Sequence, residues 1–154
     1  SILYQKNAFN KAYPASTTKM MTILMALESG IDMNKVMTMS HEAVYGIEPG
    51  SSSISLQEGE QITFEQGLYA LMLESANEVA LGLAEEMGQG DSSKFVEMMN
   101  KRAAELGCKN THFMNPNGLF DENHYTTCYD MALITREALK YDELRKIALI
   151  GINV

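Results

Sequence analysis

Apolar residues recur at helical spacing along most of the chain, and short polar or glycine-containing stretches separate the helices that this spacing predicts. The first helix should run from Ser16 to about Ser29, and apolar side chains cover nearly all of its sides. A helix that is apolar all round is usually buried. Gly30 follows at the position where a glycine commonly ends a helix. Ser16 and Lys19 therefore stand at the N-terminal end of a helix that we expect to be buried.

A capping box opens the next clear helix, because Gln66 stands three residues after Thr63. This helix should break at Glu74-Ser75-Ala76, and another should begin near Asn77. The remaining helices predicted by the same apolar spacing cover residues 92–106, 127–138 and 142–150.

Strand signals are short and few. Ser1 to Gln5 has the composition of a strand, and Val36 to Met39 could form another, with Ser40 capping a turn of helix after it. Leu56 to Thr63 surrounds a Glu58-Gly59-Glu60 turn and is consistent with a small hairpin. A chain that opens in what looks like the middle of a strand suggests a processed or trimmed fragment. The whole pattern predicts an α+β, mostly helical domain.

Composition narrows the class of protein. The chain has 154 residues, 45% of them hydrophobic, which is one domain's worth of soluble protein with a sizeable core. Twelve methionines and no tryptophan suggest that methionine fills irregular gaps in that core. The net charge of -8 argues against a nucleic-acid partner and against an anionic membrane surface. The longest apolar run, near residues 20–27, is too short to span a bilayer.

Cysteines and histidines give no sign of a metal site or a histidine-based triad. Cys108 and Cys128 have no metal-ligand spacing, and we interpret them as two packed free cysteines, although an exported protein could bridge them. No Gly-x-Ser-x-Gly elbow surrounds a serine nucleophile. We therefore interpret His41, His112 and His124 as surface or loop histidines, and we expect no zinc site.

Ser16-Thr17-Thr18-Lys19 is the first candidate for chemistry. A serine hydroxyl is a weak nucleophile unless a neighbouring base takes its proton. Residues three apart share a helix face, so Lys19 can approach Ser16, and burial would lower the pKa of its amine. The alternative for these four residues alone is a helix cap followed by an exposed lysine.

Ser75-Ala76-Asn77, at the break between two helices, is a second candidate for chemistry. The alternative for this triplet is that it only ends one helix and caps the next.

The longer string Tyr13-Pro14-Ala15-Ser16-Thr17-Thr18-Lys19-Met20-Met21-Thr22 closely resembles the nucleophile segment of the low-molecular-weight D-Ala-D-Ala carboxypeptidases. These enzymes are a branch of the penicillin-binding and serine β-lactamase superfamily. Residues 106–119 and 124–132 resemble other recurrent stretches of the same family. The resemblance implies that Ser16 is the acylated nucleophile, Lys19 its proton acceptor, Ser75 a proton shuttle and Asn77 a substrate-binding residue. It also implies the helical portion of the β-lactamase/DD-peptidase-like fold, with a remnant of its antiparallel sheet.

One element of the family pattern is missing. The family has a Lys-Thr-Gly or Lys-Ser-Gly strand that lines the cleft, and no lysine of this chain precedes a threonine or serine. We therefore expect residues 1–154 to form a partial transpeptidase-like domain that lacks the first strand and the C-terminal Lys-Thr-Gly strands.

The resemblance implies an extracytoplasmic carboxypeptidase that trims peptidoglycan stem peptides and is acylated by β-lactams; no membrane tether is recognisable in this chain. The alternative is a non-catalytic, incomplete fragment that folds, or forms a homodimer through exposed sheet edges, without turnover.

Overall fold

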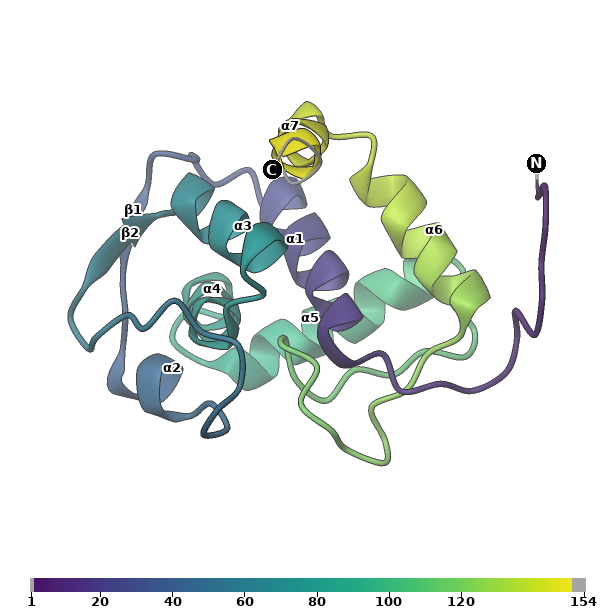
Figure 1. The fold of residues 1–154 in the computed structure, drawn as a ribbon, viewed down its shortest axis with the longest axis horizontal. Helices are drawn as coiled ribbons and strands as arrows, with labels where there is room; N and C mark the ends of the chain where they lie inside the picture. The colour runs from purple at the N-terminus through teal and green to yellow at the C-terminus, as the bar shows by residue number, and fades with distance from the viewer. Residues whose placement is uncertain (1, 151–154) are drawn as a thin grey trace.

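The structure, a computed structural model, describes residues 2–150 (Figure 1). The described chain is mostly helical, with one small antiparallel sheet. In chain order its elements are the 3-10 helix η1 (Ala15–Thr18), α1 (Lys19–Glu28), β1 (Val36–Thr38), α2 (His41–Tyr45), β2 (Gln61–Thr63), α3 (Phe64–Leu73), α4 (Asn77–Met87), α5 (Ser92–Glu105), α6 (Cys128–Ala138) and α7 (Asp142–Ile150).

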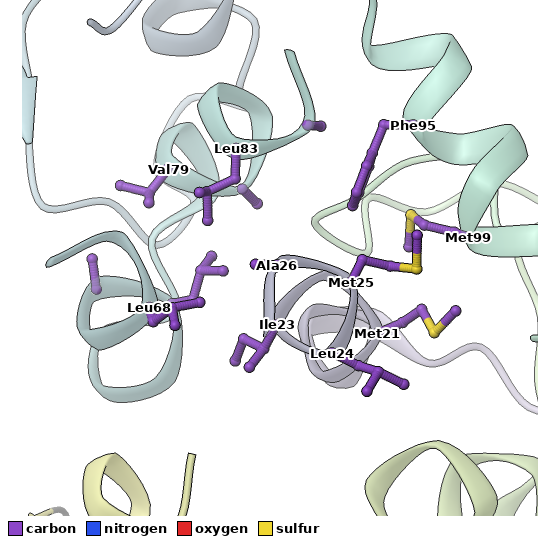
Figure 2. Packing of buried hydrophobic residues seen from close by; sticks show 14 of the residues in the cluster. Met21, Ile23, Leu24, Met25, Ala26, Leu68, Val79, Leu83, Phe95 and Met99 are labelled. Carbon is purple, nitrogen blue, oxygen red and sulfur yellow. The ribbon is translucent and has the colours of Figure 1, made fainter. Parts of the chain in front are cut away.

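Helix α1 lies at the centre of the molecule and contacts α3, α4, α5 and α6 (Figure 1). Figure 2 shows its apolar side chains pointing to different neighbours: Met21 and Met25 lie toward α5, and Ile23 lies toward α3. Met21, Leu24 and Ala26 are completely inaccessible to solvent. The prediction of a buried helix is confirmed, and Gly30, with a φ of +70°, follows its end as expected. Methionines do fill this core, because Met21 and Met99 are both fully buried.

The sheet pairs β1 with β2 in antiparallel register, with Met37 opposite Ile62. The prediction of a local hairpin within residues 56–63 is therefore wrong about the partner strand. The turn that contains Gly59 is present, but Met39 both donates to Glu60 O and accepts from the Gly59 amide, each at 2.8 Å. The backbone hydrogen bonds of this turn are thus taken by the end of β1. The buried Met37 side chain anchors β1 in the core, which fixes β1 as the partner.

The predicted strand at the N-terminus is not present in Ile2–Gln5; Ser1 lies outside the described residues. This segment runs alongside α6 without pairing to any described strand, and Leu3 is 95% exposed. Apolar, β-branched composition favours a strand only where a partner edge supplies hydrogen bonds and packing. Among residues 2–150, no helix is long and apolar enough to cross a membrane.

Side-chain caps begin the helices where the sequence predicts them. Ser40 Oγ accepts a hydrogen bond from the Ala43 amide at the start of α2, and both bonds of the capping box between Thr63 and Gln66 are formed at α3. Thr127 caps α6 in the same way. The start of α4 is different, because its N-cap residue, Ala76, makes no side-chain cap.

Candidate active site

Ser16 and Lys19 meet at the beginning of the central helix. Ser16 lies in η1 and is exposed, whereas Lys19, the first residue of α1, is only 3% exposed. The Lys19 ammonium donates hydrogen bonds to Ser16 Oγ, at 3.2 Å, and to the Asn117 carbonyl oxygen, at 2.9 Å. The alternative of a helix cap followed by an exposed lysine is therefore wrong: this lysine is buried and in contact with the serine.

Burial changes the acid–base behaviour of Lys19. Loss of solvation lowers the pKa of its amine from 10.5 to about 8, and the negative charge of Glu78 partly offsets this shift. An amine with a pKa near 8 has an appreciable deprotonated fraction at neutral to mildly alkaline pH. The neutral form can take a proton from a hydroxyl group that lies within hydrogen-bonding distance.

The turn at Asn115–Gly118 supports both residues from the opposite side. Besides the Asn117 contact to Lys19, the Pro116 carbonyl accepts a 2.6 Å hydrogen bond from the hydroxyl of Thr22. Gly118, with a φ of +92°, is so close to η1 that a Cβ atom there would lie 1.9 Å from the Ala15 carbonyl oxygen. The sequence identifies this segment as a turn, but no local signal indicates that it touches η1, which carries Ser16.

Ser75 and Asn77 lie at the break between α3 and α4, as predicted. Ser75 has a φ of +56°, and its hydroxyl is buried without a hydrogen-bond partner among the described residues. The Asn77 side-chain oxygen is also buried without a partner among the described residues, while the backbone N–H of Asn77 donates to the Ser52 carbonyl at 2.9 Å. Neither side chain is bonded to Ser16 or Lys19, so the structure brings the four residues into one region without joining them in a single network.

Ser16 borders two cavities. A cleft of about 610 Å³ has Ser16, Lys19 and Ser75 among its lining residues. A smaller pocket of about 140 Å³ is lined by Ser16 together with Asn77 and Asn117. Apolar side chains form much of the remaining wall of the larger cleft: Met20, Ile23, Leu71, Met72 and Met131. An extended ligand that reaches Ser16 could thus occupy an apolar space on one side and a polar space on the other.

His124 lies in a loop, as interpreted, but it is not at the surface. His124 is 2% exposed, and burial lowers its pKa to about 4. Its ring nitrogens are occupied by Thr18 Oγ1, at 2.8 Å, and by the Met114 amide, at 3.0 Å. No apolar neighbour in the local sequence signals this burial.

The two cysteines are both free, but only one is packed. Cys108 is buried, as expected, whereas Cys128 is exposed and lines the larger cleft with Ser16. The interpretation of two packed thiols is wrong for Cys128, because this residue is the first of α6 and its side chain points out of the core.

Known proteins resemble the chain over nearly all of its length. A family model described as D-alanyl-D-alanine carboxypeptidase matches residues 1–152. The D-alanyl-D-alanine carboxypeptidase DacF of Bacillus subtilis is 43% identical over 150 residues, which cover 94% of this chain and 37% of that protein. DacA of Escherichia coli, with the same description, is 33% identical over 146 residues, or 90% of this chain and 36% of that protein.

Solved structures agree with the sequence matches. The DD-transpeptidase of Streptomyces K15 superposes with a TM-score of 0.88 at 31% identity, over 94% of this chain and 58% of that one. Penicillin binding protein 6B of Escherichia coli gives a TM-score of 0.88 at 30% identity, over 96% of this chain and 49% of that one. The fold expected from the sequence is confirmed. The chain spans between 36% and 58% of the length of these four proteins.

Proposed function

Because this chain belongs to the D-alanyl-D-alanine carboxypeptidase family, we propose that its site acylates Ser16 with the D-Ala-D-Ala end of peptidoglycan stem peptides. The observation that carries the proposal is the hydrogen bond between a buried amine, Lys19 Nζ, and an exposed hydroxyl, Ser16 Oγ, at 3.2 Å. The share of each relative that the chain covers supports residues 1–154 as part of a larger transpeptidase-like domain.

The proposed reaction begins with the neutral Lys19 amine. It accepts the Ser16 proton as Oγ forms a bond to the carbonyl carbon of the penultimate D-alanine. The tetrahedral intermediate then collapses, the C–N bond breaks, and the leaving D-alanine takes up a proton. Ser75 would relay that proton from Lys19, since the residue lines the same cleft and its buried hydroxyl has no competing partner among the described residues. Water finally hydrolyses the ester on Ser16 and restores the serine.

Asn77 would hold the peptide. Its side-chain oxygen is free among the described residues, and the residue lines the smaller pocket beside Ser16. An amide side chain in that place can accept from a peptide N–H and donate to a peptide carbonyl.

β-Lactams mimic the D-Ala-D-Ala amide, so they should acylate Ser16 by the same first step. The substrate implies that the protein acts outside the cytoplasmic membrane. Neither the acylation of Ser16 nor the hydrolysis of its ester needs a metal or an organic cofactor.

The test is a covalent adduct. The purified chain is incubated with a fluorescent penicillin and examined by gel fluorescence and intact mass, beside Ser16→Ala. Ser29→Ala is the matched control, because Ser29 lies at the other end of the same helix. Labelling of the wild type and of Ser29→Ala, but not of Ser16→Ala, is the expected result. A folded wild-type chain without adduct would contradict the proposal and favour the alternative, a fragment that folds or dimerises without turnover.

A further inference from the structure

His124 is a buried ionisable side chain that the proposed reaction does not use. The Met114 amide can only donate, so the His124 Nδ1 atom that it contacts at 3.0 Å must be unprotonated. The proton of the neutral ring then lies on Nε2 and is donated to Thr18 Oγ1, 2.8 Å away. The pKa of about 4 keeps the ring in this neutral form at physiological pH.

The two partners of the ring belong to the two backbone segments that hold Lys19. Thr18 directly precedes Lys19 and lies in η1, the turn that carries Ser16. Met114 leads into the turn whose Asn117 carbonyl accepts the Lys19 hydrogen bond at 2.9 Å. His124 therefore bridges the donor side and the acceptor side of that contact, although neither of its nitrogens reaches Lys19.

The ring itself is firmly placed. It is 2% exposed and makes an edge contact with Phe113, with ring centroids 5.7 Å apart. The residues on either side are also anchored, since the His124 amide donates to the Asp121 carbonyl and Tyr125 exchanges backbone hydrogen bonds with His112. A rigid support of this kind can fix the separation of two backbone segments.

We propose that His124 is a positioning residue for Lys19: by bonding Thr18 with one nitrogen and the Met114 amide with the other, it holds η1 and the Asn117 turn at the separation that directs the lysine amine to Ser16. The expected effect on acylation rests on the proposed function. The placement of the Lys19 amine, and therefore its pKa, can be tested without it. A histidine that merely fills the core would stabilise the fold without affecting the chemistry of that amine.

Three substitutions separate the two ends of the bridge. Thr18→Val removes the hydroxyl with little change of shape. His124→Gln places an amide N–H near the original Nε2 position, so it can keep the Thr18 bond. His124→Leu removes both bonds. His41→Gln is the matched control, because His41 is exposed on α2 and does not line either cavity at Ser16.

The first measurement does not need catalysis. Lysine side-chain NMR with 13C-labelled lysine follows the titration of Lys19, whose signal is assigned from a Lys19→Arg sample. The wild-type amine should titrate near 8. In Thr18→Val the pKa should rise by about half a unit or more, because a loosened turn admits water to the amine. An unchanged titration in a folded Thr18→Val protein would overturn the proposal, whether or not penicillin labels the chain.

The second measurement is the rate of penicillin labelling at saturating reagent, per folded molecule. We expect a loss of about tenfold in Thr18→Val and more in His124→Leu, with a smaller loss in His124→Gln and none in His41→Gln. Thr18→Val should have no further effect in the His124→Leu background, because both changes remove the same bond. Additive losses, or a lower folded fraction with an unchanged rate, would show a structural role only. A wild type that is not labelled counts against the proposed function, and the lysine titration then decides this inference.

Discussion

Replacement of Gly118 by alanine tests whether the close approach of the Asn115–Gly118 turn to η1 holds Ser16 in place. A Cβ atom at residue 118 would lie 1.9 Å from the Ala15 carbonyl oxygen, 2.3 Å from its carbon and 3.0 Å from the Ser16 nitrogen. These are backbone atoms, so no side-chain rotation relieves the overlap. The turn and η1 must move apart, and the Lys19 contacts on both sides of them must change.

The matched control is Gly107→Ala. Gly107 has a similar φ, +86° against +92° for Gly118, but a Cβ atom there meets nothing within 4 Å. A left-handed conformation costs an alanine about 1–2 kcal/mol, and both variants share this cost. Forced displacement of packed groups adds about 1–3 kcal/mol at Gly118 alone. We therefore expect a loss of unfolding free energy of about 1–2 kcal/mol for Gly107→Ala and about 2–5 kcal/mol for Gly118→Ala.

Urea unfolding followed by circular dichroism gives both free energies, and penicillin labelling reports on Ser16. Gly107→Ala should be labelled at the wild-type rate, whereas the folded fraction of Gly118→Ala should be labelled at least about tenfold more slowly, since its nucleophile is displaced. Equal losses of stability in the two variants, together with normal labelling of Gly118→Ala, would refute the argument that this contact positions the site.

Three further predictions concern titration and reactivity. The rate of Ser16 labelling should rise with pH and level off above about 8, because the deprotonated Lys19 amine is the reactive form. Cys128 should react quickly with a disulfide reagent, because it is exposed in the cleft, and its modification should slow the labelling of Ser16. Cys108 should react only on unfolding, because burial raises the pKa of its thiol to about 11. Between pH 6.5 and about 4, His124 binds a proton in the unfolded chain but not in the folded protein, so its contribution to the unfolding free energy should fall on acidification through that range. The loss of unfolding free energy from this histidine reaches about 3 kcal/mol. This contribution should be absent in His124→Gln.

Local patterns predicted the helices and their ends because the interactions that set them lie within a few residues. The capping box at Thr63 and the glycine stop at Gly30 are both formed as expected. The Ser16–Lys19 contact belongs to the same class, since it joins residues three apart. The 3-10 geometry of η1 was not predicted; there, Ala15 adopts a φ of +48°.

Contacts between distant residues could not be predicted from local patterns. The Asn117 carbonyl that accepts from Lys19 lies 98 residues further along the chain, and a backbone carbonyl carries no sequence signature. His124 is buried, and the Thr18 hydroxyl that it contacts lies 106 residues away in the chain. The pairing of β2 with β1 instead of a local strand has the same origin, because register depends on which side chains the core accepts.

Unpaired polar atoms point to the same place as the family resemblance, by independent reasoning. Among the described residues, the buried side-chain oxygens without a hydrogen-bond partner belong to Ser51, Ser75, Asn77 and Glu78. Three of the four lie at the α3–α4 break, and Ser51 is next to the residue that accepts the Asn77 amide. Each such atom costs about 1–3 kcal/mol, and the left-handed backbone of Ser75 adds to that cost. A chain selected for stability alone would replace these groups. Two of these residues, Ser75 and Asn77, line the cavities that Ser16 borders, which agrees with the proposal that their polar atoms serve a ligand and a transferred proton.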